Sequence, residues 1–137
     1  MFLPLHPTKY AELLGNKLDA DSAVNVWLIN TGWSGGAYGT GSRMKLSYTR
    51  SMITAAMTGQ LNNVEYTPHP VFGVLMPNEV PNVPSEILIP RNTWADKEAY
   101  DKKANELAQL FINNFNKYAA MANEEIRSAA PVVMVNA

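Results

Sequence analysis

The stretch that decides the fold is "NTGWSGGAYGTGSRMKLSYTR", residues 30–50, which places five glycines in front of a basic, helix-compatible segment. Gly36 and Gly41 have the separation of the two glycines in a phosphate-binding P-loop, G-x-x-x-x-G-K-[ST]. Ser42 and Arg43 stand where that loop needs Lys and then Ser or Thr. The stretch is therefore not a P-loop, although glycine-rich backbone before a helix is a frequent place for a nucleotide or another anion.

The segments on both sides of the loop predict alternating helices and strands. Apolar side chains recur at helical spacing over residues 7–20. Residues 23–30, "AVNVWLIN", have the composition of a buried strand, and residues 69–77, "HPVFGVLMP", predict another. The sequence therefore predicts an α/β fold with a small mixed sheet and flanking helices, in which the glycine loop joins a strand to a helix.

Two further helices are predicted from the signals at their ends. One begins at Ser47, a candidate N-cap, and ends at Gly59. The other is a long amphipathic helix over residues 96–118, for which Asp96 is the preferred N-cap and Thr93 the alternative. A proline-rich, largely irregular connection precedes this long helix, and a short helix is expected in the tail that follows it.

Composition narrows the class of function. The chain has 137 residues, which suits one domain, and 11 Lys and Arg against 12 Asp and Glu give a net charge of −1. This balance argues against a general nucleic-acid-binding role. Without cysteine the chain has no disulfide or thiolate metal site, which is compatible with a reducing cytoplasm. No apolar run has the length of a membrane span.

A set of longer blocks is more specific than the glycines alone. In chain order they are "LPLHPTKYAELLG", "VWLINTGWSGGAYGTGSRMKLSYTR", "HPVFGVLMP", "VPSEIL" and "PRNTWADKEAYDKKANELAQLFINNF". Together they resemble the C-terminal part of the ATP-dependent phosphoenolpyruvate carboxykinases, from residue 3 to about residue 118. The resemblance implies a decarboxylating lyase of gluconeogenesis in the cytoplasm, which converts oxaloacetate and ATP to phosphoenolpyruvate, CO2 and ADP with Mg²⁺ and Mn²⁺.

The resemblance also implies how the chain relates to such an enzyme. Residues 1–137 would form a single C-terminal subdomain of the mononucleotide-binding domain, with residues 119–137 as a poorly ordered tail. The family's P-loop, metal ligands and oxaloacetate-binding arginine lie upstream of these blocks, and no matching motif is found here. We therefore expect no catalytic or metal-binding residue in this chain, no activity from the chain alone, and the rest of the carboxykinase chain as its partner.

The glycine-rich block resembles the family's second nucleotide element, which holds the adenosine end of ATP. The arginine of the family's G-x-R-[MI] block matches Arg43, and the threonine six residues later matches Thr49, with Met44 contributing from its backbone. A guanidinium plane can lie on adenine or donate to its ring nitrogens, and a Thr hydroxyl can donate and accept at the purine edge. Ala37 departs from the family, which often has Pro there.

Two functions stay open from the sequence. One is the adenine-side part of a carboxykinase, and the other is a stand-alone α/β module that binds a nucleotide or a protein and does no chemistry. Taken singly, Arg43 suits a surface cation and Thr49 a first-turn helix residue, while His6 suits a helix start and His69 a turn. We also expect an exposed apolar patch that drives self-association. Its candidate residues are Phe2, Leu3, Leu5, Trp33 and Tyr38.

Overall fold

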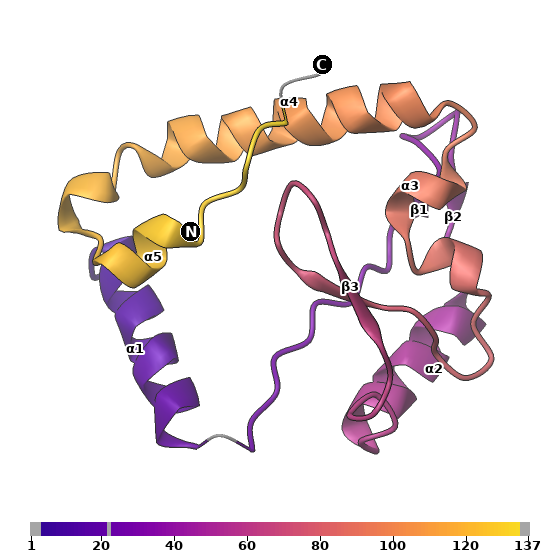
Figure 1. The fold of residues 1–137 in the computed structure, drawn as a ribbon, viewed down its shortest axis with the longest axis horizontal. Coiled ribbons are helices and arrows are strands. Elements are labelled where there is room, and N and C mark those ends of the chain that lie inside the picture. The colour runs from indigo at the N-terminus through magenta and orange to yellow at the C-terminus, as the bar shows by residue number, and fades with distance from the viewer. Residues whose placement is uncertain (1–3, 22, 135–137) are drawn as a thin grey trace.

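The computed structural model describes residues 4–21 and 23–134 of the chain. Helices and two short hairpins make up the fold, so the predicted α/β class is confirmed. Helix α4 (Lys97–Phe115) runs along the top of Figure 1, α1 (Pro7–Ala20) and α2 (Leu46–Met57) lie below it, and the hairpin that contains β3 lies between them. The strands form two separate antiparallel pairs.

Helix α1 occupies the predicted range. His6 is its N-cap residue and Pro7 fills the first helical position, where a missing N–H is harmless. Only Thr8 is buried along the helix, and its hydroxyl lies 2.8 Å from Nδ1 of His6. Leu13 and Leu14 are both more than half exposed. The helical spacing was thus read correctly, but its apolar face is not covered by the described part of the chain.

The strand predicted for residues 23–30 is wrong. The segment crosses from α1 to the first hairpin without regular secondary structure (Figure 1). Within the described residues, no backbone N–H or carbonyl of residues 25–31 has a hydrogen-bond partner. Leu28 is 85% exposed, while Trp27 and Ile29 are half-buried. A strand needs a neighbouring strand to satisfy its backbone, and the structure supplies none here.

The glycine-rich stretch folds into the first hairpin. Strand β1 (Trp33–Ser34) pairs with β2 (Ser42–Arg43), so that Trp33 lies opposite Arg43. The Ala37 carbonyl accepts from the N–H groups of Thr40 and Gly41, at 3.0 and 2.8 Å, and closes the loop. Gly36 and Gly41, which have the P-loop spacing, therefore lie in the turn of a hairpin. A side chain at Gly41 has no room, because the two arms of the hairpin come close together there.

Helix α2 follows the hairpin after two residues. It begins at Leu46 with Lys45 as the N-cap residue, so the predicted cap at Ser47 is wrong. Lys45 has no side-chain acceptor, and the first turn is closed by backbone bonds from Tyr48 and Thr49 to the Lys45 carbonyl. Gly59, at φ +72°, lies just beyond the helix end, as predicted.

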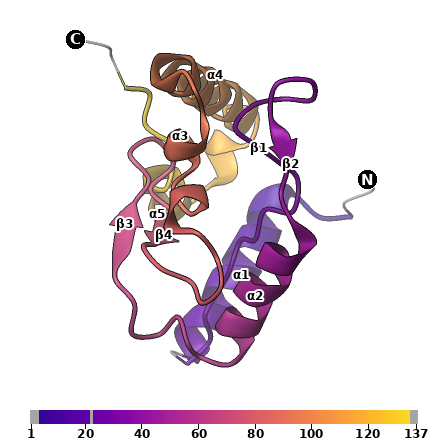
Figure 2. The same ribbon diagram turned by 90° about the vertical axis from the view of Figure 1, so that its right-hand side faces the viewer.

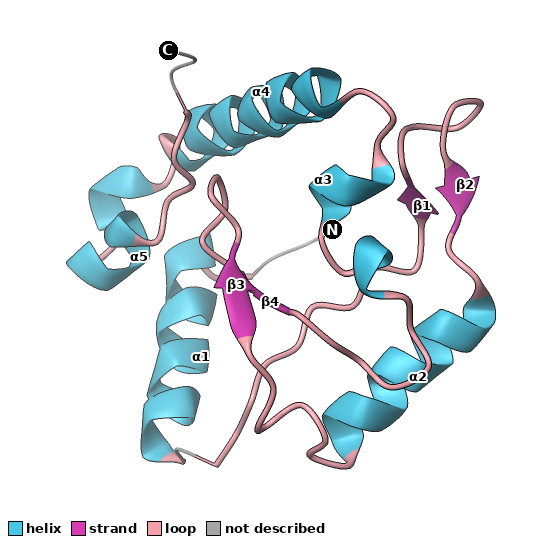
Figure 3. Cartoon of the chain, turned by 45° about the vertical axis from the view of Figure 1, so that its right-hand side comes forward, coloured by secondary structure: helices cyan, strands magenta, loops and turns pink. Residues whose placement is uncertain are grey.

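The second hairpin replaces the predicted strand over residues 69–77. Strand β3 (Tyr66–Pro68) pairs with β4 (Leu75–Pro77), and residues 69–74 form the loop between them. Only the end of the predicted strand is thus extended and paired. The connection that follows contains a 3-10 turn, η1 (Ser85–Ile87), and a short helix, α3 (Pro90–Thr93), which lies beside β1 in Figure 3.

Helix α4 begins at the predicted N-cap. The Asp96 carboxylate accepts from the N–H groups of Glu98 and Ala99, at 2.9 and 3.0 Å. After α4 come a 3-10 turn, η2 (Ala119–Met121), and the predicted short helix, α5 (Glu124–Ser128). The chain then returns along the second hairpin, where Val132 N–H donates to the Val71 carbonyl at 2.8 Å.

None of the helices in the described residues has the length and hydrophobicity that a bilayer crossing requires.

Two small apolar clusters form the core. One gathers around Ala55 and Leu61 beneath α2, and the other joins Val71 of the second hairpin to Ala104 and Ala108 of α4. Figure 2 shows α4 and α2 on different sides of the second hairpin. Large apolar side chains stay exposed, including three candidates for self-association, Leu5, Trp33 and Tyr38. The other two candidates, Phe2 and Leu3, lie outside the described residues, and self-association stays a prediction.

Candidate functional site

A pocket of about 410 Å³ lies where β2 leads into α2. Its lining contains all three residues predicted from the sequence, together with two that were not. These are Thr31, Arg43, Met44, Leu46 and Thr49. Because β2 ends at Arg43 and α2 begins at Leu46, the hairpin and the first helical turn bring side chains six positions apart to one pocket. The structure thus gathers the predicted residues without identifying what they bind.

Arg43 contributes an unpaired cation. Its residue is exposed, and its backbone is held in the ladder opposite Trp33. The ion pairs found in the described part of the chain are Lys9–Glu12, Arg91–Asp101 and Lys103–Glu106, so none involves Arg43. The guanidinium therefore keeps its five donors and its flat face available for a ligand.

Thr49 contributes a hydroxyl from a buried position. The residue is only 6% exposed, and its N–H bonds to the Lys45 carbonyl in the first turn of α2. Its hydroxyl forms no hydrogen bond with any described residue, yet it is not sealed off from solvent. Such a hydroxyl can both donate to a ligand and accept from it.

Met44 contributes a backbone acceptor. Its N–H donates to the Gly32 carbonyl at 3.0 Å and so extends the pairing of the first hairpin. Its carbonyl has no hydrogen-bond partner among the described residues. The backbone group that Met44 can offer in this pocket is therefore an acceptor and not a donor.

Sequence reasoning missed Thr31 and Leu46. Thr31 is exposed, lies just before the first hairpin and lines the same pocket. Leu46 opens α2 and gives the pocket an apolar wall, although most of its side chain is exposed. Their positions next to the glycine loop were the only sequence signal, because neither residue type indicates ligand binding by itself.

A larger hollow of about 990 Å³ also borders the first hairpin. Its lining includes residues 25–30, the hairpin residues 33–36, Val74 with strand β4, and the corner between α3 and α4. Trp27 is half-buried against the core beside it, while Trp33 is partly exposed and packs edge-on to Tyr38 at 5.2 Å. The hollow is mainly apolar, so it fits packed polypeptide better than a charged ligand.

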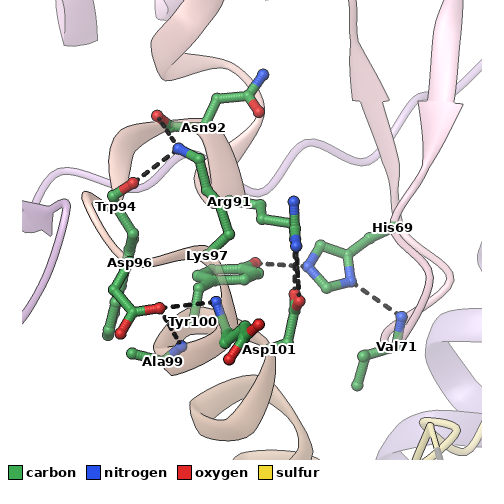
Figure 4. Close-up of polar contacts among 11 residues, drawn as sticks. His69, Val71, Arg91, Asn92, Trp94, Asp96, Lys97, Ala99, Tyr100 and Asp101 are labelled. Carbon is green, nitrogen blue, oxygen red and sulfur yellow. Dashed lines mark hydrogen bonds and ion pairs between the residues drawn. The ribbon is translucent and has the colours of Figure 1, made fainter. Parts of the chain in front are cut away.

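The corner between α3 and α4 borders this hollow with a polar network, which Figure 4 shows. Nδ1 of His69 accepts from the Val71 and Phe72 N–H groups, so in the neutral ring Nε2 carries the proton and donates to the Tyr100 hydroxyl at 2.7 Å. Burial lowers the pKa of His69 and raises the pKa of Tyr100. Both groups are satisfied inside the protein, which supports the turn role predicted for His69.

The His, Asp and Glu side chains of the described residues do not gather into a set of metal ligands. No group of three or more His, Asp or Glu side chains is placed there to hold a metal ion. The donor set of this part of the chain therefore does not fit a Mg²⁺ or Mn²⁺ site.

Comparison with known proteins identifies the family. The family described as phosphoenolpyruvate carboxykinase matches residues 1–86. The phosphoenolpyruvate carboxykinase (ATP) of Flavobacterium johnsoniae is 66% identical over 131 residues, which is 96% of this chain and 24% of the relative. The enzymes of the same name from Christiangramia forsetii and Brucella suis are 59% and 48% identical, over 96% and 99% of this chain and 24% and 25% of theirs.

The chain belongs to the phosphoenolpyruvate carboxykinase family. It spans about a quarter of the length of the curated relatives that it matches. The predicted resemblance is thereby confirmed, whereas the nucleotide-binding roles of Arg43, Met44 and Thr49 stay predictions.

Proposed function

We propose that this chain supplies the adenine-side wall of the ATP site in an ATP-dependent phosphoenolpyruvate carboxykinase. The reaction of that enzyme joins the decarboxylation of oxaloacetate to phosphoryl transfer from ATP, and yields phosphoenolpyruvate, ADP and CO2. The observation that carries the proposal is the pocket in which Arg43, Met44 and Thr49 meet. Family membership supports it, because the relatives carry ATP in their name.

The chemistry of the pocket favours adenine. Arg43 would lie against the purine ring or donate to its ring nitrogens, and the Thr49 hydroxyl would bond at the purine edge. The free Met44 carbonyl accepts, which suits the exocyclic amino group of adenine; guanine presents an acceptor oxygen at the same ring position. Leu46 would cover the apolar face of the base.

The phosphate half of the site would come from other parts of the enzyme. Phosphoryl transfer depends on metal ions and a phosphate cradle that position the reactants. The sequence contains no G-x-x-x-x-G-K-[ST] motif, and the described residues hold no cluster of metal ligands. Under this proposal Mg²⁺ and Mn²⁺ act through residues outside this chain, the chain alone is inactive, and the parent enzyme works in the cytoplasm. The chain's span of one quarter of its relatives favours this over the stand-alone binding module.

The decisive variant is Arg43→Ala in a carboxykinase of the relatives' full length that contains this sequence. The apparent KM for ATP should rise, with the KM for oxaloacetate unchanged, because only the adenine end loses a partner. The expected loss is on the order of 1–3 kcal/mol, as for a hydrogen bond that involves a charged group. Thr49→Val should cost roughly 1 kcal/mol, since one neutral hydroxyl is removed with little change of volume.

Arg50→Ala is the matched control, because Arg50 is a neighbouring exposed cation on α2 that does not line the pocket. It should leave the KM for ATP unchanged. Unchanged ATP dependence in both Arg43→Ala and Thr49→Val would show that this pocket does not hold adenine.

A further inference from the structure

The first hairpin meets α3 at a contact that leaves no space. Gly35 lies at the start of the hairpin loop with φ +80°, and a Cβ atom at this position would lie 2.8 Å from the Thr93 carbonyl oxygen. A backbone oxygen cannot rotate away as a flexible side chain can. Any side chain at Gly35 would therefore push the hairpin and α3 apart, in addition to the strain of a positive φ.

Lys97 holds the end of α3 that touches Gly35. Its ammonium donates to the Asn92 carbonyl at 2.9 Å and to the Trp94 carbonyl at 2.7 Å, the two carbonyls on either side of Thr93 (Figure 4). A cation is favourable at the carbonyl end of a helix, and Lys97 is half-buried here. The ammonium thus fixes the short backbone segment on which Gly35 rests.

A second link ties the same short helix to α4. Nε and Nη2 of Arg91 donate to the Asp101 carboxylate in a bidentate pair, with distances of 2.8 Å. The Arg91 guanidinium lowers the pKa of Asp101, so the carboxylate stays charged over the whole neutral range. Helix α3 is therefore attached to α4 near both of its ends, and Figure 3 shows it beside β1, below the near end of α4.

We propose that Lys97 is a positioning residue for the nucleotide pocket, and that it acts through the Thr93 carbonyl and Gly35. The β-pairing carries the effect further, because Trp33 and Ser34 precede Gly35 and lie opposite Arg43 and Ser42. The position of the Gly35 backbone against α3 therefore determines the position of the Arg43 guanidinium in the pocket. The inference rests on the proposed adenine-binding function and adds to it a residue outside the pocket.

The test is steady-state kinetics of a full-length carboxykinase that contains this sequence. Lys97→Met keeps the methylene chain and removes the ammonium, and should raise the KM for ATP about fivefold, with the KM for oxaloacetate unchanged. Gly35→Ala should raise the KM for ATP about tenfold, because it displaces the hairpin directly. Lys97→Arg should restore most of the affinity, since a guanidinium can also donate to two carbonyls.

Lys103→Met is the matched control, because Lys103 lies on the same helix, is exposed and pairs with Glu106. It should leave both KM values unchanged. If Gly35→Ala does not fold, Lys97→Met and its rescue by Arg still test the inference.

The combined variant distinguishes positioning from a general loss of structure. Lys97→Met in the Gly35→Ala background should add little, because the two changes act on one contact. Additive effects, or equal increases in the KM values of ATP and oxaloacetate, would overturn the positioning role. An unchanged KM for ATP in the Arg43→Ala variant would instead contradict the proposed function on which the inference rests.

Discussion

The two hairpins of the chain differ in what stabilises their loops. The loop of the second hairpin is held by one of its own side chains, because Nδ1 of His69 accepts from Val71 N–H at 3.1 Å and from Phe72 N–H at 3.2 Å. His69 is 6% exposed, and its Nε2 donates to the hydroxyl of Tyr100 on α4. The loop of the first hairpin is closed by bonds to the Ala37 carbonyl and rests on α3 through Gly35.

This difference shows how polar groups become available for a ligand. In the second hairpin both ring nitrogens of His69, the polar side chain of the loop, form hydrogen bonds within the protein. In the first hairpin, the glycine backbone and the contact of Gly35 with α3 hold the loop in place. The side chains of Arg43, on β2, and Thr49, on α2, therefore need not form hydrogen bonds within the protein. The candidate pocket therefore lies beside the hairpin whose polar side chains form no hydrogen bonds within the described residues.

The largest expected effect is on the second hairpin. His69→Ala should lower the free energy of unfolding by about 3 kcal/mol, because it leaves buried polar groups unpaired and opens a cavity. Urea unfolding monitored by circular dichroism measures the loss. His6→Ala is the control, since His6 is only half-buried and its ring lies near Thr8 and Tyr118, and it should cost much less. Equal losses in the two variants would show that His69 does not hold the loop.

A smaller effect is expected in the first hairpin. A Cβ atom at Gly41 would collide with the Gly36 carbonyl oxygen and would lie 2.6 Å from the Ser34 carbonyl oxygen. Gly41→Ala should cost about 2 kcal/mol in the same unfolding experiment, as in other overpacked sites. In a full-length enzyme it should also raise the KM for ATP, which His69→Ala should leave unchanged. An unchanged KM in Gly41→Ala would break the link between this hairpin and the pocket.

The smallest effect concerns pH. Burial lowers the pKa of His69 from its ordinary 6.5, so the unfolded chain binds a proton more readily than the folded one. The contribution of His69 to stability is therefore complete above pH 6.5 and decreases as the pH falls through 6.5 toward the folded pKa. Urea midpoints between pH 7.5 and 5.5 measure this, and His69→Asn, which keeps an acceptor without titrating, should reduce the slope. Identical slopes in both proteins would contradict the assignment.

Local signals predicted the helices well. The N-cap at Asp96 is confirmed because an Asp side chain satisfies its own helix end, whatever packs elsewhere. The end of α2 at Gly59 is confirmed for the same kind of reason. The start of α2 was misplaced at Ser47, since backbone bonds to Lys45 close the first turn without a side-chain cap.

Features that depend on distant partners were predicted less well. Residues 23–30 have the composition of a buried strand, yet strand pairing needs a second segment that the described chain does not provide. The pocket residues Arg43, Met44 and Thr49 came from the resemblance, because spacing alone left Arg43 as a surface cation. Thr31 and Leu46 became visible only when the hairpin and α2 placed them beside these residues.

The backbone of residues 25–31, which has no hydrogen-bond partner among the described residues, has a further consequence for proteolysis. A protease needs to thread its substrate through the active site as unpaired chain, and accessible segments of this kind are cut before folded ones. Leu28, at 85% exposure, offers the side chain that a chymotrypsin-like specificity pocket would accept. Cleavage there would place α1 on one product and the entire Arg43 pocket on the other, so limited digestion would separate the two in a single step.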